Sequence, residues 1–159
     1  MQNSDKQILA DISDAMQNTD LLAEIQSILD NALMQIENIN PNCNACGNCC
    51  DFANFGHRLY VSTGELANLI SQEPIDAQIP IENLKCPYQK DNLCLARNAR
   101  PLGCRLFFCD DKVNLQYQQI YEAYYDKIKQ VHLKFSTAYN YLELSAGLKI
   151  YSSGGNLEK

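Results

Sequence analysis

The spacing of the cysteines constrains this chain more than any other feature of its sequence. Four of them fall within eight residues, as Cys43-x2-Cys46-x2-Cys49-Cys50. The other four are Cys86, Cys94, Cys104 and Cys109. Thiols at this density are typical of disulfide frameworks, metal sites or redox centres. The fold is therefore expected to bring two separated halves of the chain together around them.

Length and composition indicate in which cellular compartment, and with which class of partner, these thiols act. The chain has 159 residues, enough for one domain with its own core, so small size does not make disulfides necessary. The start, Met1–Lys6, is polar, and no segment approaches the ~18 apolar residues of a membrane-spanning helix. We therefore expect a cytoplasmic protein, in which clustered thiols bind metal or act in redox chemistry. The net charge of −6 argues against nucleic acid and anionic membranes, and leaves a protein or redox partner as the expected one.

Residues 1–40 contain no cysteine and are predicted to form an N-terminal helical segment of two amphipathic helices. Apolar residues recur in both at helical spacing. They are Ile8, Leu9, Ile12 and Met16, and then Leu21, Leu22, Ile25, Ile28, Leu29, Leu33 and Ile36. Thr19 or Asp20 is expected to cap the second helix, and Asn40-Pro41 to end it. We expect this hairpin to pack over the cysteine domain; the alternative is a helix that binds a partner.

Residues 41–111 are expected to form the cysteine-cluster metal-binding core. A short strand is predicted over His57–Val61. Ser62 and Glu65 have the spacing of a capping box, in which each residue's side chain bonds the backbone N–H of the other. A short helix should follow and end at Glu73-Pro74.

The second half of this core is predicted to contain a hairpin. The residues at 90–92 are typical of a turn, so Cys86 and Cys94 are expected to face each other across it. One helical turn is predicted over Leu95–Ala99.

Residues 112–150 are predicted to form C-terminal helices that pack on the core. The long helix spans 112–135 and has one apolar face. That face contains Leu115, Ile120, Tyr124, Ile128, Val131 and Phe135. A shorter helix is predicted around Tyr141–Leu144, and residues 151–159 are expected to be a disordered tail. These patterns predict a mainly α fold, in which N- and C-terminal helices clasp a small irregular core ligated by cysteines.

Three interpretations of the eight thiols compete. A disulfide framework fits a cytoplasmic protein poorly. Structural zinc sites hold each ion with four ligands, but the distal gaps of seven, nine and four residues are irregular for such sites. The Cys43-x2-Cys46-x2-Cys49 run is typical of bacterial ferredoxins, where a Cys followed by Pro completes the motif, and Cys86-Pro87 has that order. Spacing alone leaves a [4Fe–4S] cluster and zinc both open.

The doubled Cys49-Cys50 bears on the number of centres. Neighbouring side chains diverge in extended backbone, so Cys50 is expected to point away from a centre held by Cys43, Cys46 and Cys49. Cys50 would then join distal cysteines in a second centre. The alternative is one four-ligand centre with four spare thiols, which pack as small apolar residues or act in redox chemistry.

All the arginines lie inside the cysteine-bearing stretch. They are Arg58, Arg97, Arg100 and Arg105. A thiolate centre is negatively charged, and donors to its sulfurs stabilise it and tune its potential. Arg100 and Arg105 are the candidates for that role, unless they only pack and cap locally. His57 is a further candidate ligand, whereas His132 lies in a predicted helix and is expected to be structural.

Enzyme signals are sparse. The chain has no glycine-rich phosphate loop, no His-Glu-x-x-His motif and no serine nucleophile motif. The catalytic residues are therefore unknown from the sequence, and whether the chain is an enzyme stays open.

Taken together, the two halves of the motif resemble the CxxCxxCC cysteine-cluster family. The resemblance covers residues 43–109 and needs several spaced elements at once. They are Cys43-x2-Cys46-x2-Cys49-Cys50, Val61-Ser62-Thr63-Gly64-Glu65-Leu66, Cys86-Pro87, Cys94 and Arg100-Pro101-x2-Cys104-Arg105. Members of this family are described as zinc- or iron-chelating proteins.

The resemblance implies that all eight cysteines are metal ligands. They are Cys43, Cys46, Cys49, Cys50, Cys86, Cys94, Cys104 and Cys109. One branch, the flagellin lysine N-methylases, is similar in its cysteine motif and is associated with an iron–sulfur cluster, which favours iron–sulfur over zinc. This chain is much shorter than those enzymes, so the resemblance does not carry methyl transfer with it.

We therefore expect a metal-binding protein that holds an iron–sulfur cluster, or zinc or iron, through its cysteines. Its role would be structural, electron-transfer or metal-handling. The alternatives are a cluster-dependent modifying enzyme of the methylase type and a zinc-stabilised protein-interaction module.

Overall fold

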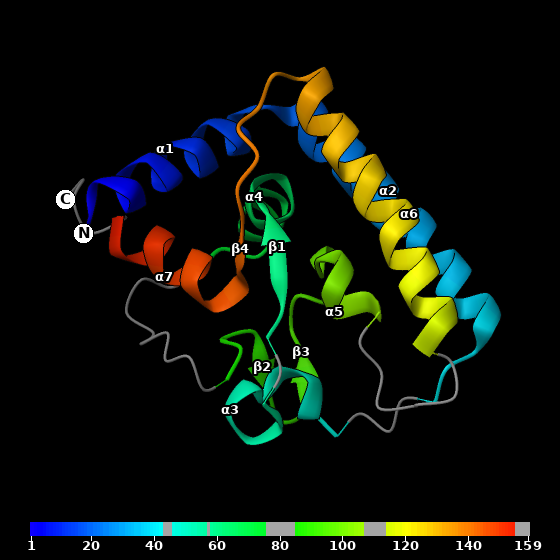
Figure 1. The fold of residues 1–159 in the computed structure, drawn as a ribbon. Helices are drawn as coiled ribbons and strands as arrows, with labels where there is room; N and C mark the ends of the chain where they lie inside the picture. The colour runs from blue at the N-terminus through cyan, green and yellow to red at the C-terminus, as the bar shows by residue number, and fades with distance from the viewer. Residues whose placement is uncertain (43–45, 57, 76–84, 107–113, 155–159) are drawn as a thin grey trace.

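The structure is a computed structural model that describes residues 1–42, 46–56, 58–75, 85–106 and 114–154. Within these ranges the chain forms seven α-helices and two small two-stranded sheets, which confirms the prediction of a mainly α fold (Figure 1). No helix in the described part of the chain is both long and apolar enough to cross a bilayer.

The N-terminal segment forms the two predicted helices, α1 (Asn3–Gln17) and α2 (Thr19–Ile39). The cap of α2 differs from the prediction of Thr19 or Asp20, because the side chain of Asn18 accepts the backbone N–H of Leu21 at 3.0 Å. Asn18 also ends α1, so one residue forms the whole break between the helices. The predicted end of α2 is confirmed, since Asn40 adopts a left-handed conformation as its C-cap.

Helix α4 (Thr63–Gln72) lies at the centre of the fold (Figure 1). The predicted capping box of Ser62 and Glu65 is confirmed, as is the helix end before Glu73. Every residue from Thr63 to Ile70 is buried, because α1, α2 and α7 (Leu144–Gly154) all pack against this helix. A helix buried on all sides has to satisfy its polar groups internally.

Strand β1 (Tyr60–Ser62) leads into α4 and pairs with β4 (Tyr141–Glu143) in an antiparallel sheet. The helix predicted around Tyr141–Leu144 is therefore wrong, because its first three residues are held by backbone pairing with β1. Helix α7 begins directly after β4 and continues to Gly154. The predicted disordered tail is wrong for residues 151–154, since Gly154 is buried against Leu9 of α1. Residues 155–159 lie outside the described part of the chain.

Helix α6 (Asn114–Lys134) packs along α2, and the two lie side by side in Figure 1. Most of the predicted apolar face is buried or half-buried, but Leu115 is 69% exposed and Tyr117 takes a buried position instead. Nine residues separate Leu115 from Tyr124, which is about two and a half helical turns and places Leu115 on the opposite face.

His132, near the end of α6, is structural as predicted. Its Nε2 accepts the backbone N–H of Gly64 at 3.2 Å, and its Nδ1 lies 3.1 Å from the carbonyl oxygen of Ala138. A Cβ at Gly64 would lie only 2.8 Å from that Nε2, so the close approach of α6 to the start of α4 requires glycine. Burial lowers the pKa of His132, which keeps the ring neutral and able to accept the N–H.

Short elements connect the cysteines in the remaining part of the fold. They are η1 (Asn48–Cys50), α3 (Phe52–Phe55), β2 (Gln89–Lys90), β3 (Leu93–Cys94), η2 (Arg97–Ala99) and α5 (Leu102–Leu106). The predicted hairpin turn is confirmed, since Asp91 and Asn92 both have positive φ and join β2 to β3. The facing pair differs from the prediction, because Cys94 pairs with Gln89 and Cys86 precedes the strand.

The carboxylate of Glu65 joins α4 to α5. One oxygen, Oε2, accepts the backbone N–H and the hydroxyl of Ser62, both at 2.8 Å. The other, Oε1, accepts the backbone N–H of Leu102 at the start of α5, at 2.9 Å. Burial raises the pKa of Glu65, while these hydrogen bonds and the positive charge of Arg105 oppose that shift. One buried side chain therefore serves the first turns of two helices.

Replacing Glu65 by glutamine should destabilise the fold. Whichever way the amide is turned, its NH2 group would face a backbone N–H donor of either Ser62 or Leu102. A buried donor left without an acceptor costs about 1–3 kcal/mol, so the free energy of unfolding in urea should fall by that amount. Glu37→Gln, on an exposed position of α2, is the matched control. Equal unfolding free energies for the two variants would show that the Glu65 contacts do not support the fold.

Candidate metal centre

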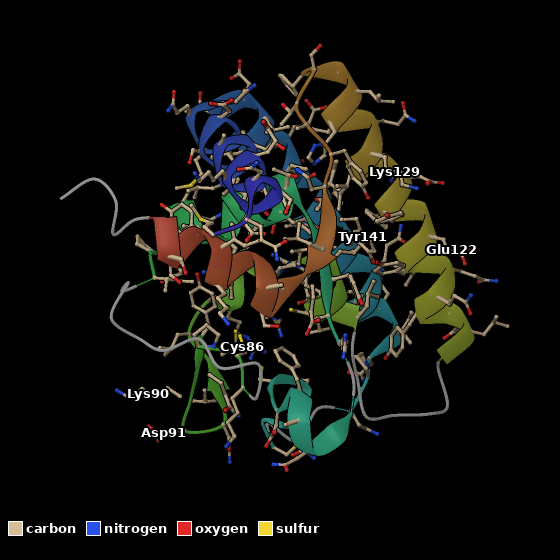
Figure 2. The ribbon with its side chains drawn as sticks, turned by 60° about the vertical axis from the view of Figure 1, so that its left-hand side comes forward. Cys86, Lys90, Asp91, Glu122, Lys129 and Tyr141 are labelled. Atoms are coloured by element: carbon tan, nitrogen blue, oxygen red, sulfur yellow. The ribbon has the colours of Figure 1, made fainter. Side chains whose placement is uncertain are left out.

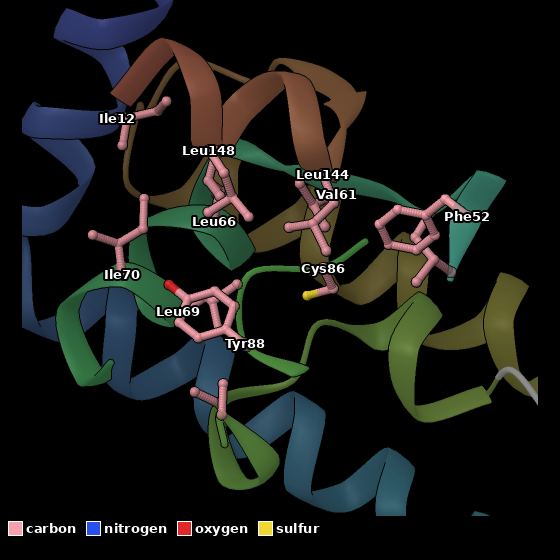
Figure 3. Packing of buried hydrophobic residues seen from close by; sticks show 13 residues of the cluster. Ile12, Phe52, Val61, Leu66, Leu69, Ile70, Cys86, Tyr88, Leu144 and Leu148 are labelled. Atoms are coloured by element: carbon pink, nitrogen blue, oxygen red, sulfur yellow. The ribbon is translucent and has the colours of Figure 1, made fainter. Parts of the chain in front are cut away.

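Five of the six cysteines that the structure describes line one small cavity of about 30 Å³. They are Cys49, Cys50, Cys86, Cys94 and Cys104. They come from η1, the segment before β2, β3 and α5, so four separate parts of the chain meet there. Apolar side chains line the walls, among them Leu59, Phe52 and Tyr88, and Figure 3 shows the last two near Cys86.

Backbone hydrogen bonds hold these segments together. The N–H of Cys86 donates to the carbonyl oxygen of Cys50 at 2.9 Å, which joins the two halves of the cysteine motif directly. The side chain of Gln89 donates to the carbonyl oxygen of Gly47 at 3.1 Å. Gly47 has a φ of +76°, and a Cβ there would lie 2.3 Å from the amide nitrogen of Gln89. The loop before η1 thus needs glycine both for its conformation and for this contact.

Cys49 and Cys50 both face the cavity, and their sulfurs lie 3.8 Å apart. The expectation that Cys50 points away from its neighbour is therefore wrong. It assumed extended backbone, whereas these residues lie in a 3₁₀ helix, where successive side chains differ by about 120°. Cys50 also lies close to Cys86, and the two thiols interact.

Four of the thiols at the cavity have a raised pKa, which keeps them in their neutral form. A hydrogen bond with Cys50 and burial raise the pKa of Cys49, and burial raises the pKa of Cys94 and Cys104. For Cys50, the hydrogen bond with Cys49 lowers the pKa, but contact with Cys86 and burial outweigh it and raise the value to about 12. Without a cation in the cavity these groups keep their protons at neutral pH.

The two arginines predicted to serve the centre have different positions. Arg100 lines the cavity, and its positive charge opposes the raised pKa values of Cys49, Cys94 and Cys104. Arg105 is 1% exposed, and its guanidinium donates to the carbonyl oxygens of Asn98 and Arg100 at 2.6 and 2.7 Å. Arg105 therefore fixes the backbone that carries Arg100, and it does not line the cavity.

Among the other predicted metal ligands, Cys46 lies within the described residues, and it does not line this cavity. Cys46 is exposed, away from the lining residues. Cys43, Cys109 and His57 lie outside the described residues. No group of three or more His, Cys, Asp or Glu side chains in the described ranges is arranged so that it could hold a metal ion. The described thiols therefore lie close together at the cavity but are not arranged as a metal coordination site.

Several residues that build the cavity were missed in the sequence. Phe52, Leu59 and Leu144 supply apolar walls, and Gln89 ties the hairpin to Gly47. The apolar residues gave no local signal, because they belong to elements far apart in the chain. The glycine between Cys46 and Cys49 did carry a signal, since a glycine in a ligand loop often marks a left-handed residue.

Comparison with protein-family models, with curated proteins and with solved structures found no match to this chain. The resemblance to the cysteine-cluster family thus rests on the motif alone.

The metal-free protein should lose stability at alkaline pH. The folded state keeps the proton of Cys50 up to about pH 12, whereas an unfolded thiol loses it near 9.0. The unfolded state therefore binds fewer protons in this window, and the free energy of unfolding should fall as pH rises through it. Buried tyrosines, such as Tyr88, act in the same direction.

Urea unfolding of reduced protein across this pH range measures the effect, and Cys50→Ser isolates the share of one thiol because serine does not ionise. The loss of stability should be shallower in Cys50→Ser than in the control Cys46→Ser, which alters an exposed thiol. Equal slopes in the two variants would contradict the assignment of Cys50 to a protonated, buried cavity.

Proposed function

We propose that this chain is a metal-binding protein whose centre forms at the cavity lined by Cys49, Cys50, Cys86, Cys94 and Cys104. The observation that carries the proposal is the meeting of five thiols from four separate segments around one small cavity. Buried free cysteines occur in many cores as small apolar residues, but they are rarely gathered in this number beside an arginine.

The chemistry of the donors fits both metals that the sequence leaves open. Thiolates are the preferred ligands of structural zinc and of iron–sulfur clusters. A cavity of about 30 Å³ accommodates roughly two water-sized groups, so a single ion would fit its size, and the described thiols would have to rotate to coordinate that ion. A [4Fe–4S] cluster would need the surrounding segments to move apart as well.

The chain's own residues would serve such a centre in defined ways. Arg100 would offset part of the negative charge of the thiolates, and Arg105 would keep the carbonyl of Arg100 in place. Phe52, Leu59 and Tyr88 would exclude water, which for an iron–sulfur cluster affects the potential. A structural, electron-transfer or metal-handling role follows from this arrangement, with a protein or redox partner.

The wider ligand set implied by the motif remains part of the proposal. Cys43, Cys46 and Cys109 would extend the centre or form a second one. Five thiols at one cavity already exceed the four that a zinc ion or a [4Fe–4S] cluster needs. A single centre is therefore the simpler arrangement, with the remaining cysteines outside it.

Metal analysis of anaerobically purified protein, together with its visible absorption spectrum, tests the proposal. Broad visible absorption with iron and sulfide indicates a cluster, and a colourless protein with bound zinc indicates a zinc site. Cys104→Ser should lose most of the metal and melt at a lower temperature, because metal binding contributes to folding in small domains. Protein that contains neither metal, with all its thiols titrating as free, would contradict the proposal.

Cys46→Ser is the matched variant for this experiment, since it changes an exposed thiol of the same motif. It should keep its metal if one centre lies at the cavity. Loss of metal as complete as in Cys104→Ser would instead show that the centre includes the first half of the motif.

A further inference from the structure

A second hollow lies on the other side of Leu59 from the cysteine cavity. This groove has a volume of about 300 Å³, which is near the lower end of the range for small-molecule sites. Its walls come from β1, α5, α6, β4 and the residues before β1. Figure 2 shows Tyr141 of β4 beside α6, where this groove lies. Neither the cysteine motif nor the metal proposal accounts for it.

Tyrosine rings form much of the groove surface. Tyr60 of β1 lies opposite Glu143 and is a diagonal neighbour of Tyr141 on β4. The two tyrosine rings stack at 5.4 Å between centroids, with 24° between their planes. Both are partly exposed, at 39% and 42%, so these nearly parallel rings remain accessible. Tyr121 bonds the hydroxyl of Tyr141 at 2.5 Å, which fixes the ring against α6. A rigid aromatic surface of this kind favours stacking or edge contact with another planar ring.

The polar groups of the groove are one arginine, which only donates hydrogen bonds, and a glutamine and tyrosines, which both donate and accept. Arg58 is the charged residue among the described lining residues, and no carboxylate is among them. Its guanidinium is 68% exposed and meets Glu143 at 3.4 Å, a weak surface contact that leaves other N–H groups for a ligand. Gln118 and the tyrosine hydroxyls add further donors. Arg58 is therefore the group through which this groove would bind an anion.

We propose that this groove binds a small ligand made of a planar aromatic ring with one carboxylate or phosphate group. The ring would lie against Tyr60 and Tyr141, and the anionic group would bond to Arg58. The proposal does not rest on a metal, because no cysteine is among the lining residues in the part of the chain that the structure describes.

The position of the groove connects it to the cysteine cavity. Leu59 lines both hollows, and Gly103 of the groove directly precedes Cys104 of the cavity. A ligand that contacts Gly103 would therefore lie next to the residue that carries a cavity thiol, and Leu59 would contact both hollows. Binding in the groove should consequently be visible at the backbone amide of Cys104 as well as at Tyr60.

Calorimetric titration and amide NMR shifts of the full chain test the proposal, with phenyl phosphate and benzoate as probes. Both should bind saturably and shift the amides of Tyr60 and Gly103. Cyclohexanecarboxylate, an anion without an aromatic ring, and benzyl alcohol, a neutral aromatic, should both bind more weakly. Equal binding of either control compound would contradict the joint requirement for ring and charge.

Variants then assign the two parts of the site. Arg58→Gln should weaken phenyl phosphate binding by about tenfold, since a charge-assisted hydrogen bond is lost. Tyr60→Leu should weaken it by about three- to tenfold through loss of the ring contact. Arg97→Gln removes the same charge from an exposed position outside the groove and should bind like the unaltered protein. Equal affinities of Arg58→Gln and Arg97→Gln, or no saturable binding of either probe, would overturn the proposal.

Discussion

The buried carboxylate of Glu65 is the interaction on which the arrangement of this fold depends. The first turn of α4 lies in the interior, where water does not reach its free N–H groups. Glu65 closes the capping box with Ser62 and uses its second oxygen for the N–H of Leu102. Since Leu102 begins the short helix that carries Cys104, the same contact places one wall of the cysteine cavity. One side chain thus stabilises the start of the central helix and also positions the segment that carries Cys104.

Hydrogen bonds to backbone carbonyl groups, and not contacts between thiols, hold the segments around the cavity together. Hydrogen bonds from Cys86 to Cys50, and from Gln89 to Gly47, join the two halves of the motif without any sulfur taking part. A hydrogen bond with Cys50 and burial raise the pKa of Cys49, burial raises the pKa of Cys104, and the charge of Arg100 opposes both shifts. Metal binding at such a site would have to displace protons, so its affinity would increase with pH. The fold therefore positions the thiols, whereas a bound cation would be needed to favour their thiolate form.

The sequence was informative wherever a local rule acts within a few residues. The capping box, the turn at Asp91 and Asn92 and the break before Pro41 all follow from short-range hydrogen bonding and backbone preference. Prediction from the sequence failed where a residue far away in the chain determines the local structure. Tyr141–Glu143 form a strand because β1 lies beside them, and the direction of Cys50 follows from a 3₁₀ turn that the assumption of extended backbone did not include.

The cysteines illustrate the same limit at the level of the site. Spacing grouped Cys43, Cys46 and Cys49 as one set, because ligand loops of known clusters have that period. The structure instead places Cys49 with Cys50 and three distal cysteines, while Cys46 is exposed. A spacing rule describes how a loop can turn its side chains toward an ion that is already bound. In the metal-free fold the packing of Phe52, Leu59 and Leu144 decides which thiols turn inward, and this packing depends on residues far from the motif.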